Sequence, residues 1–152
     1  MSIKDNMLLS KLAQFKHEIL RKEELQDITG TYIKDLAIAL ANENQAVKEL
    51  SGGNQQKVVI AKWLSMAPDV LIMDEPTRGI DIGAKTEIYN LMRRLTEQGM
   101  SIIMISSEMA EIMKISDRVV VMHEGSKTGE MNSQEVTQEA VRSAAIGGGK
   151  GL

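Results

Sequence analysis

The segment from Leu50 to Asp81 constrains the fold of this chain more than any other. It opens with LSGGNQQK, in which two adjacent glycines precede a helix-forming stretch, and it later contains VLIMDE, an apolar run that ends in two carboxylates. Adjacent glycines let backbone N–H groups approach an anion without a Cβ in the way, and the following helix directs its positive dipole end to the same point. Ser51 adds a hydroxyl donor. This combination predicts a site for nucleotide phosphates.

The two carboxylates follow a predicted strand. The run that begins at Val70 has the length and the lack of alternation of a strand buried on both faces of a parallel sheet. Asp74 and Glu75 would therefore emerge at the carboxyl end of the strand, where open α/β sheets bind ligands. Asp74 is suited to a hydrated Mg2+, which takes one or two carboxylates plus phosphate oxygens. Glu75 is suited to polarising an attacking water.

These residues resemble the ATP-binding cassette (ABC) family, in which LSGGQ is the signature sequence and an apolar run followed by DE is the Walker B motif. Asn54 is a departure, because the common signature has Gln there. LSGGNQQKVVIAKWL and DEPTRGIDIGAKTEIY are similar to the second cassette of the tandem ATPase subunits of bacterial monosaccharide importers, and ISSEMAEIMKISDRVVVMHEG looks most like their ribose group. The resemblance extends from Ser2 to about Gly147.

In such subunits each ATP lies between the P-loop of one cassette and the signature of the other. The resemblance implies that Ser51, Gly52 and Gly53 reach the γ-phosphate of an ATP held by the first cassette. Asp81, which ends the loop after Walker B, would touch the opposing cassette; its interpretation as a helix N-cap is equally compatible. The residues implied to bind nucleotide are Ser51, Gly52, Gly53, Asn54, Gln55 and Asp81.

A second site would belong to this cassette itself, with Asp74 holding Mg2+ through water and Glu75 as the catalytic carboxylate. The family usually places a histidine after the strand that follows Walker B, and Ser107 occupies that position here. Because a serine cannot carry a positive charge or span the same distance, we expect this site to hydrolyse ATP poorly even in an intact subunit. A compatible interpretation is that Ser106 and Ser107 cap the short helix that follows.

The P-loop pattern GxxxxGK[ST], which would hold the β and γ phosphates, does not occur in the sequence. The nearest stretches, 149–151 and 125–128, lack the required glycine and Ser/Thr spacing and are better interpreted as tail and turn. The chain therefore looks like the carboxyl-terminal two-thirds of a cassette. Such a piece would have exposed sheet edges and unburied apolar faces, and by itself it is predicted to be inactive.

The predicted fold class is α/β: a partial P-loop NTPase, with parallel strands flanked by helices, an N-terminal helical lobe and no P-loop portion. The predicted parts are the first part of the helical signature subdomain (1–49), the signature motif and helix (50–66), the carboxyl-terminal part of a RecA-like core with Walker B (67–146) and a flexible tail (147–152). Predicted helices span about 2–12, 17–41, 54–64, 83–98, 108–114 and 134–145, with three parallel strands at 70–75, 101–106 and 118–122 and a short antiparallel strand ending near 131. Gly30 is expected to break or bend the second helix, and Ser133 to cap the last.

Composition narrows the function classes. The net charge of −3 and the pI near 5.5, with four scattered aromatic residues, argue against binding of nucleic acid. The absence of cysteine excludes disulfides and thiolate metal sites and fits the cytosol. His17 and His123 lie far apart, without ligand partners in motif spacing. No apolar run is long enough to span a membrane, so we expect any membrane connection to run through a partner.

The resemblance implies an energy-coupling ATPase subunit of a bacterial sugar importer, for ribose or a related monosaccharide, that uses ATP and Mg2+. Its partners would be the first cassette, transmembrane permease subunits docked on the helical lobe and, indirectly, a periplasmic or extracellular sugar-binding protein. It would act as a peripheral protein on the cytoplasmic face of the membrane. Two alternatives stay open: a non-hydrolytic interaction fragment, and a soluble cassette protein of translation or repair, which usually keeps the histidine and lacks NQQK.

Overall fold

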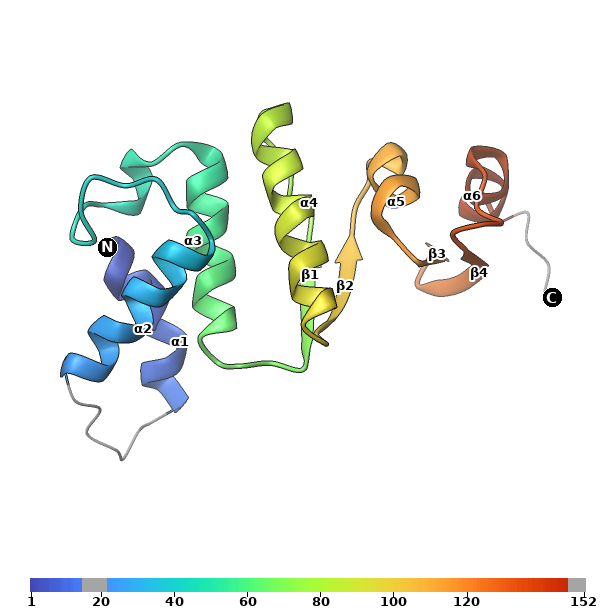
Figure 1. The fold of residues 1–152 in the computed structure, drawn as a ribbon. Coiled ribbons are helices and arrows are strands. Elements are labelled where there is room, and N and C mark those ends of the chain that lie inside the picture. The colour runs from blue at the N-terminus through green and yellow to red at the C-terminus, as the bar shows by residue number, and fades with distance from the viewer. Residues whose placement is uncertain (15–21, 148–152) are drawn as a thin grey trace. The chain divides into compact units, whose positions relative to one another are not determined.

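The computed structural model describes residues 1–14 and 22–147 (Figure 1). The chain divides into two units, Met1–Ile105 and Ser106–Leu152. The first unit contains α1 (Ile3–Gln14), α2 (Lys22–Asp35), the short 3-10 helix η1 (Val47–Glu49), α3 (Gly52–Leu64), β1 (Val70–Asp74), α4 (Ile82–Glu97) and β2 (Ser101–Ile105). The second contains α5 (Met109–Ile115), β3 (Arg118–His123), β4 (Ser126–Asn132) and α6 (Gln138–Ala145). The predicted start of the second helix, at His17, and most of the predicted tail lie outside the described residues.

The N-terminal part of the first unit is the predicted helical lobe. α1 packs against α3 and α2 (Figure 1). The buried apolar side chains of α1 and α3 are Ile3, Met7, Leu8, Val58, Ile60, Ala61 and Leu64. Ser2 begins α1 as expected, because its Oγ accepts a hydrogen bond from the Asp5 N–H at 3.1 Å. A polar contact closes the lobe at its other end, where the Tyr32 hydroxyl donates to the Leu64 carbonyl oxygen at 2.7 Å.

α2 differs from its prediction in two respects. It continues through Gly30 without a break, and it ends at Asp35 instead of near residue 41. Its end is a Schellman motif, since the Ala37 N–H donates to the Lys34 oxygen and the Ile38 N–H to the Ile33 oxygen. Ala37 takes the left-handed conformation, with φ +47°. Because this position is usually held by glycine and is an alanine here, the sequence carries no signal for the end of the helix.

The carboxyl-terminal part of the first unit is a β1–α4–β2 segment with a parallel pair of strands. The strands pair in register from Val70 opposite Ser101 to Asp74 opposite Ile105. α4 packs against β2 and α3. Its buried stripe is Ile88, Leu91, Met92 and Leu95. This stripe repeats at helical spacing, and it confirms the predicted helix to within a residue at each end.

The prediction that β1 is buried on both faces is wrong. Burial alternates along the strand, with Leu71 and Met73 buried while Val70 and Ile72 are 50% and 65% exposed. Ile103 and Ile105 of β2 are also half exposed. Helix α4 covers one face of the pair, and no described residues bury the other. The expected unburied apolar face is therefore present.

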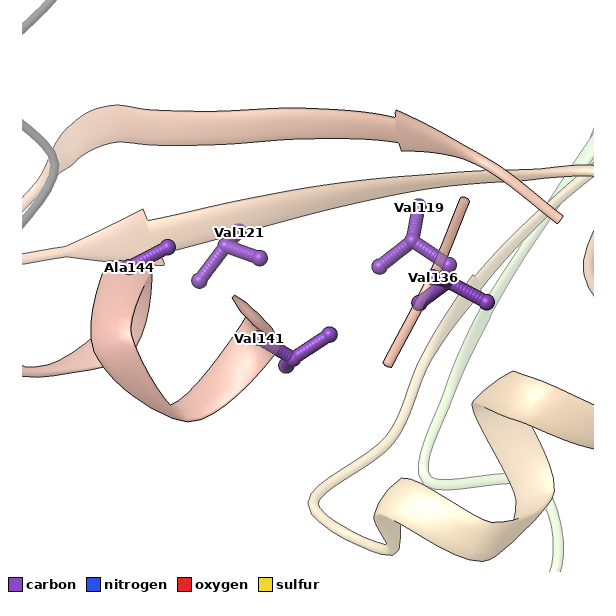
Figure 2. Packing of buried hydrophobic residues seen from close by; sticks show 5 residues of the cluster. All are labelled: Val119, Val121, Val136, Val141 and Ala144. Carbon is purple, nitrogen blue, oxygen red and sulfur yellow. The ribbon is translucent and has the colours of Figure 1, made fainter. Parts of the chain in front are cut away.

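The second unit is a β-hairpin covered on one face by α6. β3 pairs antiparallel with β4, and Glu124 and Gly125 both take positive φ in the two-residue turn, as such hairpins require. Figure 2 shows the side chains that form its core. The buried cluster is Val119, Val121, Val136, Val141 and Ala144.

Two predictions for the second unit are corrected. Within the described residues β3, predicted as a third parallel strand, pairs only with β4 and in antiparallel direction, because the two-residue turn after His123 folds the chain back beside it. The last helix begins at Gln138 and not near residue 134. Thr137 is its N-cap in place of Ser133, and its side chain accepts a hydrogen bond from the Ala140 N–H at 3.1 Å.

Candidate functional site

The signature turn stands at the N-terminus of α3, a helix of 13 residues. Ser51 is the N-cap, with φ −59° and ψ +155°, and its carbonyl oxygen accepts the Gln55 N–H at 2.9 Å. Ser51 and Gly52 are exposed, whereas Gly53 is buried. The positive end of the α3 dipole and the hydroxyl of Ser51 therefore meet solvent at the same place.

The twin glycines have different surroundings. A Cβ on Gly53 would stand 2.6 Å from the Cβ of Ala84 in α4, a distance that side-chain carbons do not reach. A Cβ on Gly52 would stand 3.2 Å from Cγ2 of Ile80. The close approach of α3 to α4 thus requires glycine at position 53. Gly52 is exposed to solvent, although Ile80 would lie close to an added Cβ.

The two side chains after the glycines bond to the protein itself. Asn54 donates through Nδ2 to Ser51 Oγ and accepts the Ala39 N–H at Oδ1, both at 2.9 Å. Gln55 donates through Nε2 to the Leu50 carbonyl oxygen at 2.8 Å. Both amides therefore fix the turn from within, and their predicted contact with nucleotide stays a prediction.

Lys57 is a buried ion-pairing residue that the sequence analysis did not select. Its Nζ lies 2.8 Å from Oε2 of Glu87 in α4 and donates to the Ala37 carbonyl oxygen at 3.0 Å. Arg94 of α4 also donates to the same segment, at the Asp35 carbonyl oxygen. Helical spacing could have indicated that Lys57 is buried, because it lies four residues before Ala61 on the buried side of α3.

The Walker B carboxylates emerge where the sequence predicted, at the carboxyl end of β1. Asp74 is its last residue and is exposed. Glu75 follows with φ +47°, held there because its N–H donates to the Ile105 oxygen at 2.9 Å and its carbonyl accepts the Arg78 N–H at 3.2 Å. A left-handed conformation in a residue other than glycine costs about 1–2 kcal/mol, and such strain concentrates at functional positions.

Asp81 and Ser107 lie in different units. The N-cap interpretation of Asp81 is confirmed, because its Oδ1 accepts the Ala84 N–H at 2.9 Å, and its carboxylate is exposed. Ser107 is exposed in the second unit, after the end of β2. The neighbouring Ser106 accepts the Glu108 N–H at 3.0 Å and donates to the buried Glu111 at 2.9 Å. The interpretation that the two serines cap α5 is corrected, because Glu108 holds the N-cap position, although Ser106 bonds to two residues at the start of the helix.

Comparison with known proteins agrees with this arrangement. Residues 2–78 match the family described as ABC transporter. The ribose import ATP-binding proteins of Clostridium perfringens (strain 13 / Type A) and Bacillus subtilis (strain 168) are each 50% identical to this chain, over 150 and 151 residues. These matches cover 97% of this chain, and the chain spans about 30% of the length of each relative. Among the described residues no helix is long and apolar enough to cross a membrane.

Solved cassettes share the fold. An ATP-binding cassette of an ABC transporter superimposes with a TM-score of 0.79 at 22% identity, over 95% of this chain and 62% of that one. A dimeric cassette in a post-hydrolysis state, bound to ADP and Pi, gives 0.75 at 22% identity over 88% of this chain and 57% of that one. The family match, the relatives and the shared α/β fold lead to one conclusion: this chain belongs to the ABC transporter family of ATP-binding cassettes.

Proposed function

We propose that this chain provides an ABC signature to an ATP that a partner cassette holds, within the energy-coupling ATPase of a bacterial sugar importer. The observation that carries the proposal is the exposed Ser51–Gly52 turn at the N-terminus of α3. The first N–H groups of a helix have no partner inside the helix, and they point along the dipole toward an anion. Together with the Ser51 hydroxyl they supply donors for the charge of a transferring γ-phosphate.

The transport assignment rests on the relatives. Their names describe ribose import, and they are 50% identical to this chain. We therefore assign ribose or a related monosaccharide as the cargo. The partners are a first cassette, transmembrane permease subunits and, indirectly, a sugar-binding protein outside the membrane, so the chain acts at the cytoplasmic face as a peripheral protein.

Asp74 and Glu75 serve the site of their own cassette. An exposed aspartate at the end of a parallel strand provides the hard oxygen donor that Mg2+ prefers, and Mg2+ takes its remaining ligands from water and phosphate. When bound, Mg2+ would neutralise charge on the phosphates. Glu75 orients and polarises the attacking water. Since Ser107 stands in place of the usual histidine and the sequence contains no P-loop motif, hydrolysis at this site is slow or absent in the chain by itself.

The test is ATP turnover with and without a partner. The chain by itself should show no turnover above background, and turnover should appear when it is mixed with the first cassette of a ribose import relative. Ser51→Arg should remove that activity, because the larger cation fills the turn, while the exposed control Lys114→Arg on α5 should not. Robust turnover by the chain by itself would contradict the proposal.

A second candidate is a non-hydrolytic interaction fragment, which the half-exposed apolar face of β1 and β2 favours. It predicts binding to a partner cassette without any gain in turnover. In that case Ser51→Arg would leave the complex and its activity unchanged, whereas substitution of Ile72 would weaken the complex. The same mixing experiment therefore separates the two candidates.

A further inference from the structure

We propose that Asn54 is a positioning residue that fixes the hydrogen-bond direction of the signature turn, so that the Ser51 hydroxyl proton is presented to an acceptor outside the chain. The inference rests on the proposed function and adds a role for a residue that departs from the common signature. It starts from the two groups that the Asn54 amide connects, which are the Ala39 backbone N–H and the Ser51 hydroxyl.

The direction of these bonds follows from one donor. A backbone N–H can only donate, so the atom of Asn54 that faces Ala39 N at 2.9 Å must be the amide oxygen. The other amide atom, Nδ2, then faces Ser51 Oγ at 2.9 Å. An amide NH2 can only donate, so Ser51 Oγ accepts in this contact. Its own proton is left to be donated elsewhere.

This direction suits a phosphate. Phosphate oxygens only accept hydrogen bonds, and a hydroxyl whose direction is not fixed must rotate before it presents its proton to them. The Asn54 contact occupies an acceptor site of Ser51 in advance, at an exposed turn on the positive end of α3. Donors that are oriented before the reaction stabilise charge at no cost of reorganisation when it develops.

The anchor of this arrangement is itself held in place. Ala39 lies two residues after the left-handed Ala37 that ends α2, and the carbonyl oxygen of Ala37 accepts from the buried Lys57 at 3.0 Å. Lys57 also pairs with Glu87 of α4. The segment that carries the Ala39 N–H is therefore tied to α3 at two points, and the Ser51 hydroxyl is set by the helical lobe.

The decisive variant is Asn54→Asp, assayed in the full chain mixed with the first cassette of a ribose import relative. An ionised carboxylate still accepts from Ala39 but cannot donate to Ser51, so the serine proton turns inward. We expect kcat of the mixture to fall by about tenfold or more at pH 8, the size of a lost hydrogen bond to a charged group. Activity should recover toward acid pH, where a protonated carboxyl donates again.

A double-mutant cycle with Ser51→Ala separates this effect from simple charge repulsion. If direction matters, Asn54→Asp should cost much less in the Ser51→Ala background, where no hydroxyl remains to be turned. Equal costs in both backgrounds would overturn the inference. A loss that Gln56→Glu reproduces in full, with the same charge on the same helix, would overturn it too.

Hydrogen exchange provides a readout that does not depend on activity. The Ala39 amide should exchange faster in Asn54→Ala than in the parent chain, and Asn54→Asp should keep it protected. Unchanged protection in Asn54→Ala would show that the Ala39 bond is absent and the inference wrong. The two proposals fail separately: if Ser51→Ala leaves turnover of the mixture unaltered, the proposed function fails, whereas a loss in Ser51→Ala with a fully active Asn54→Asp refutes the role of Asn54 alone.

Discussion

Gly53 and Ala84 touch so closely that a Cβ on the glycine would stand 2.6 Å from the Cβ of the alanine. The contact joins the buried start of α3 to the first turn of α4. The N–H of Ala84 also donates to Asp81, so the same residue meets both the signature turn and the end of the loop after Walker B. The position of the signature turn is therefore coupled by packing to α4, whose N-cap Asp81 ends the loop that follows Asp74 and Glu75.

Substitution of Gly53 should destabilise the chain even when only one methyl group is added. Gly53→Ala forces α3 and α4 apart and should lower the free energy of unfolding by roughly 1–3 kcal/mol. Gly30→Ala is the matched control, because nothing lies within 4 Å of its added Cβ. In the α2 interior it should stabilise the chain by about 0.5–1 kcal/mol. Urea unfolding followed by Trp63 fluorescence measures both, and equal effects would contradict the packing role.

Lys57 should matter more for stability than its partner Glu87. Lys57→Met removes the ion pair and leaves the Ala37 oxygen without its donor, at a cost of roughly 1–3 kcal/mol. Glu87→Gln should cost less than about 1 kcal/mol, because the glutamate side chain is 63% exposed and water screens the pair. Urea unfolding of the two variants tests this order. A Glu87→Gln loss as large as that of Lys57→Met would show that the ion pair dominates.

The left-handed backbone at Glu75 predicts a ranking of substitutions. Glu75→Asn and Glu75→Val both remove the carboxylate, but asparagine tolerates φ +47° and a β-branched valine does not. Glu75→Val should therefore be less stable than Glu75→Asn by about 1–2 kcal/mol. Thermal and urea unfolding give the comparison. If the two variants are equally stable, the backbone at this residue carries no strain.

The Tyr32 hydroxyl should make the helical lobe sensitive to alkaline pH. Burial, together with the nearby negative charge of Asp35, raises the pKa of Tyr32 above 10.0. A raised pKa means that the folded state holds the proton more tightly than the unfolded state does. The stability that the Tyr32 hydroxyl contributes is therefore complete below pH 10 and falls as pH rises through the folded-state pKa. Tyr32→Phe removes the hydrogen bond to the Leu64 carbonyl oxygen and should lower the free energy of unfolding by about 1 kcal/mol at neutral pH. The variant should also lack the loss of stability at alkaline pH. An identical pH profile in both proteins would contradict it.

The half-exposed face of β1 and β2 should drive association of the chain in isolation. Ile72→Thr combined with Ile103→Thr should reduce binding of a hydrophobic dye and shift concentration-dependent sedimentation toward smaller species, since the two side chains are 65% and 53% exposed on that face. Ile82→Thr is the control, because Ile82 is 84% exposed on α4. It should leave the association state as it is. An equal shift in the control would mean that this face of the sheet does not drive the association.

The elements with a clear period were predictable from the sequence. The stripe of α4 and the alternation between helix and strand around it place Asp74, Glu75 and Asp81 at the correct ends of their elements. The end of α2 was not predictable, because an alanine holds the left-handed position where glycine is usual. Burial of β1 was overestimated, since an unbroken apolar run does not say how many of its faces a given chain covers.

The candidate site was predicted as a set of residues but not as a set of contacts. LSGGN placed Ser51, Gly52 and Gly53 in one turn before a helix, yet it did not distinguish the buried Gly53, whose partner Ala84 is distant in sequence. The bond from Asn54 to Ala39 and the pairing of Lys57 with Glu87 also depend on tertiary packing. Local pattern shows which residue types the chemistry needs, and packing decides which of them face the ligand.

Photoaffinity labelling with an ATP analogue that carries the reactive group on its γ-phosphate tests the central claim most directly. The analogue is bound to a P-loop cassette of a ribose import relative, this chain is added, and the labelled peptide is mapped by mass spectrometry. We predict label within Ser51–Gln55 only when both proteins are present, and its loss in Ser51→Arg. Label that is absent from this turn in an active mixture would contradict the account.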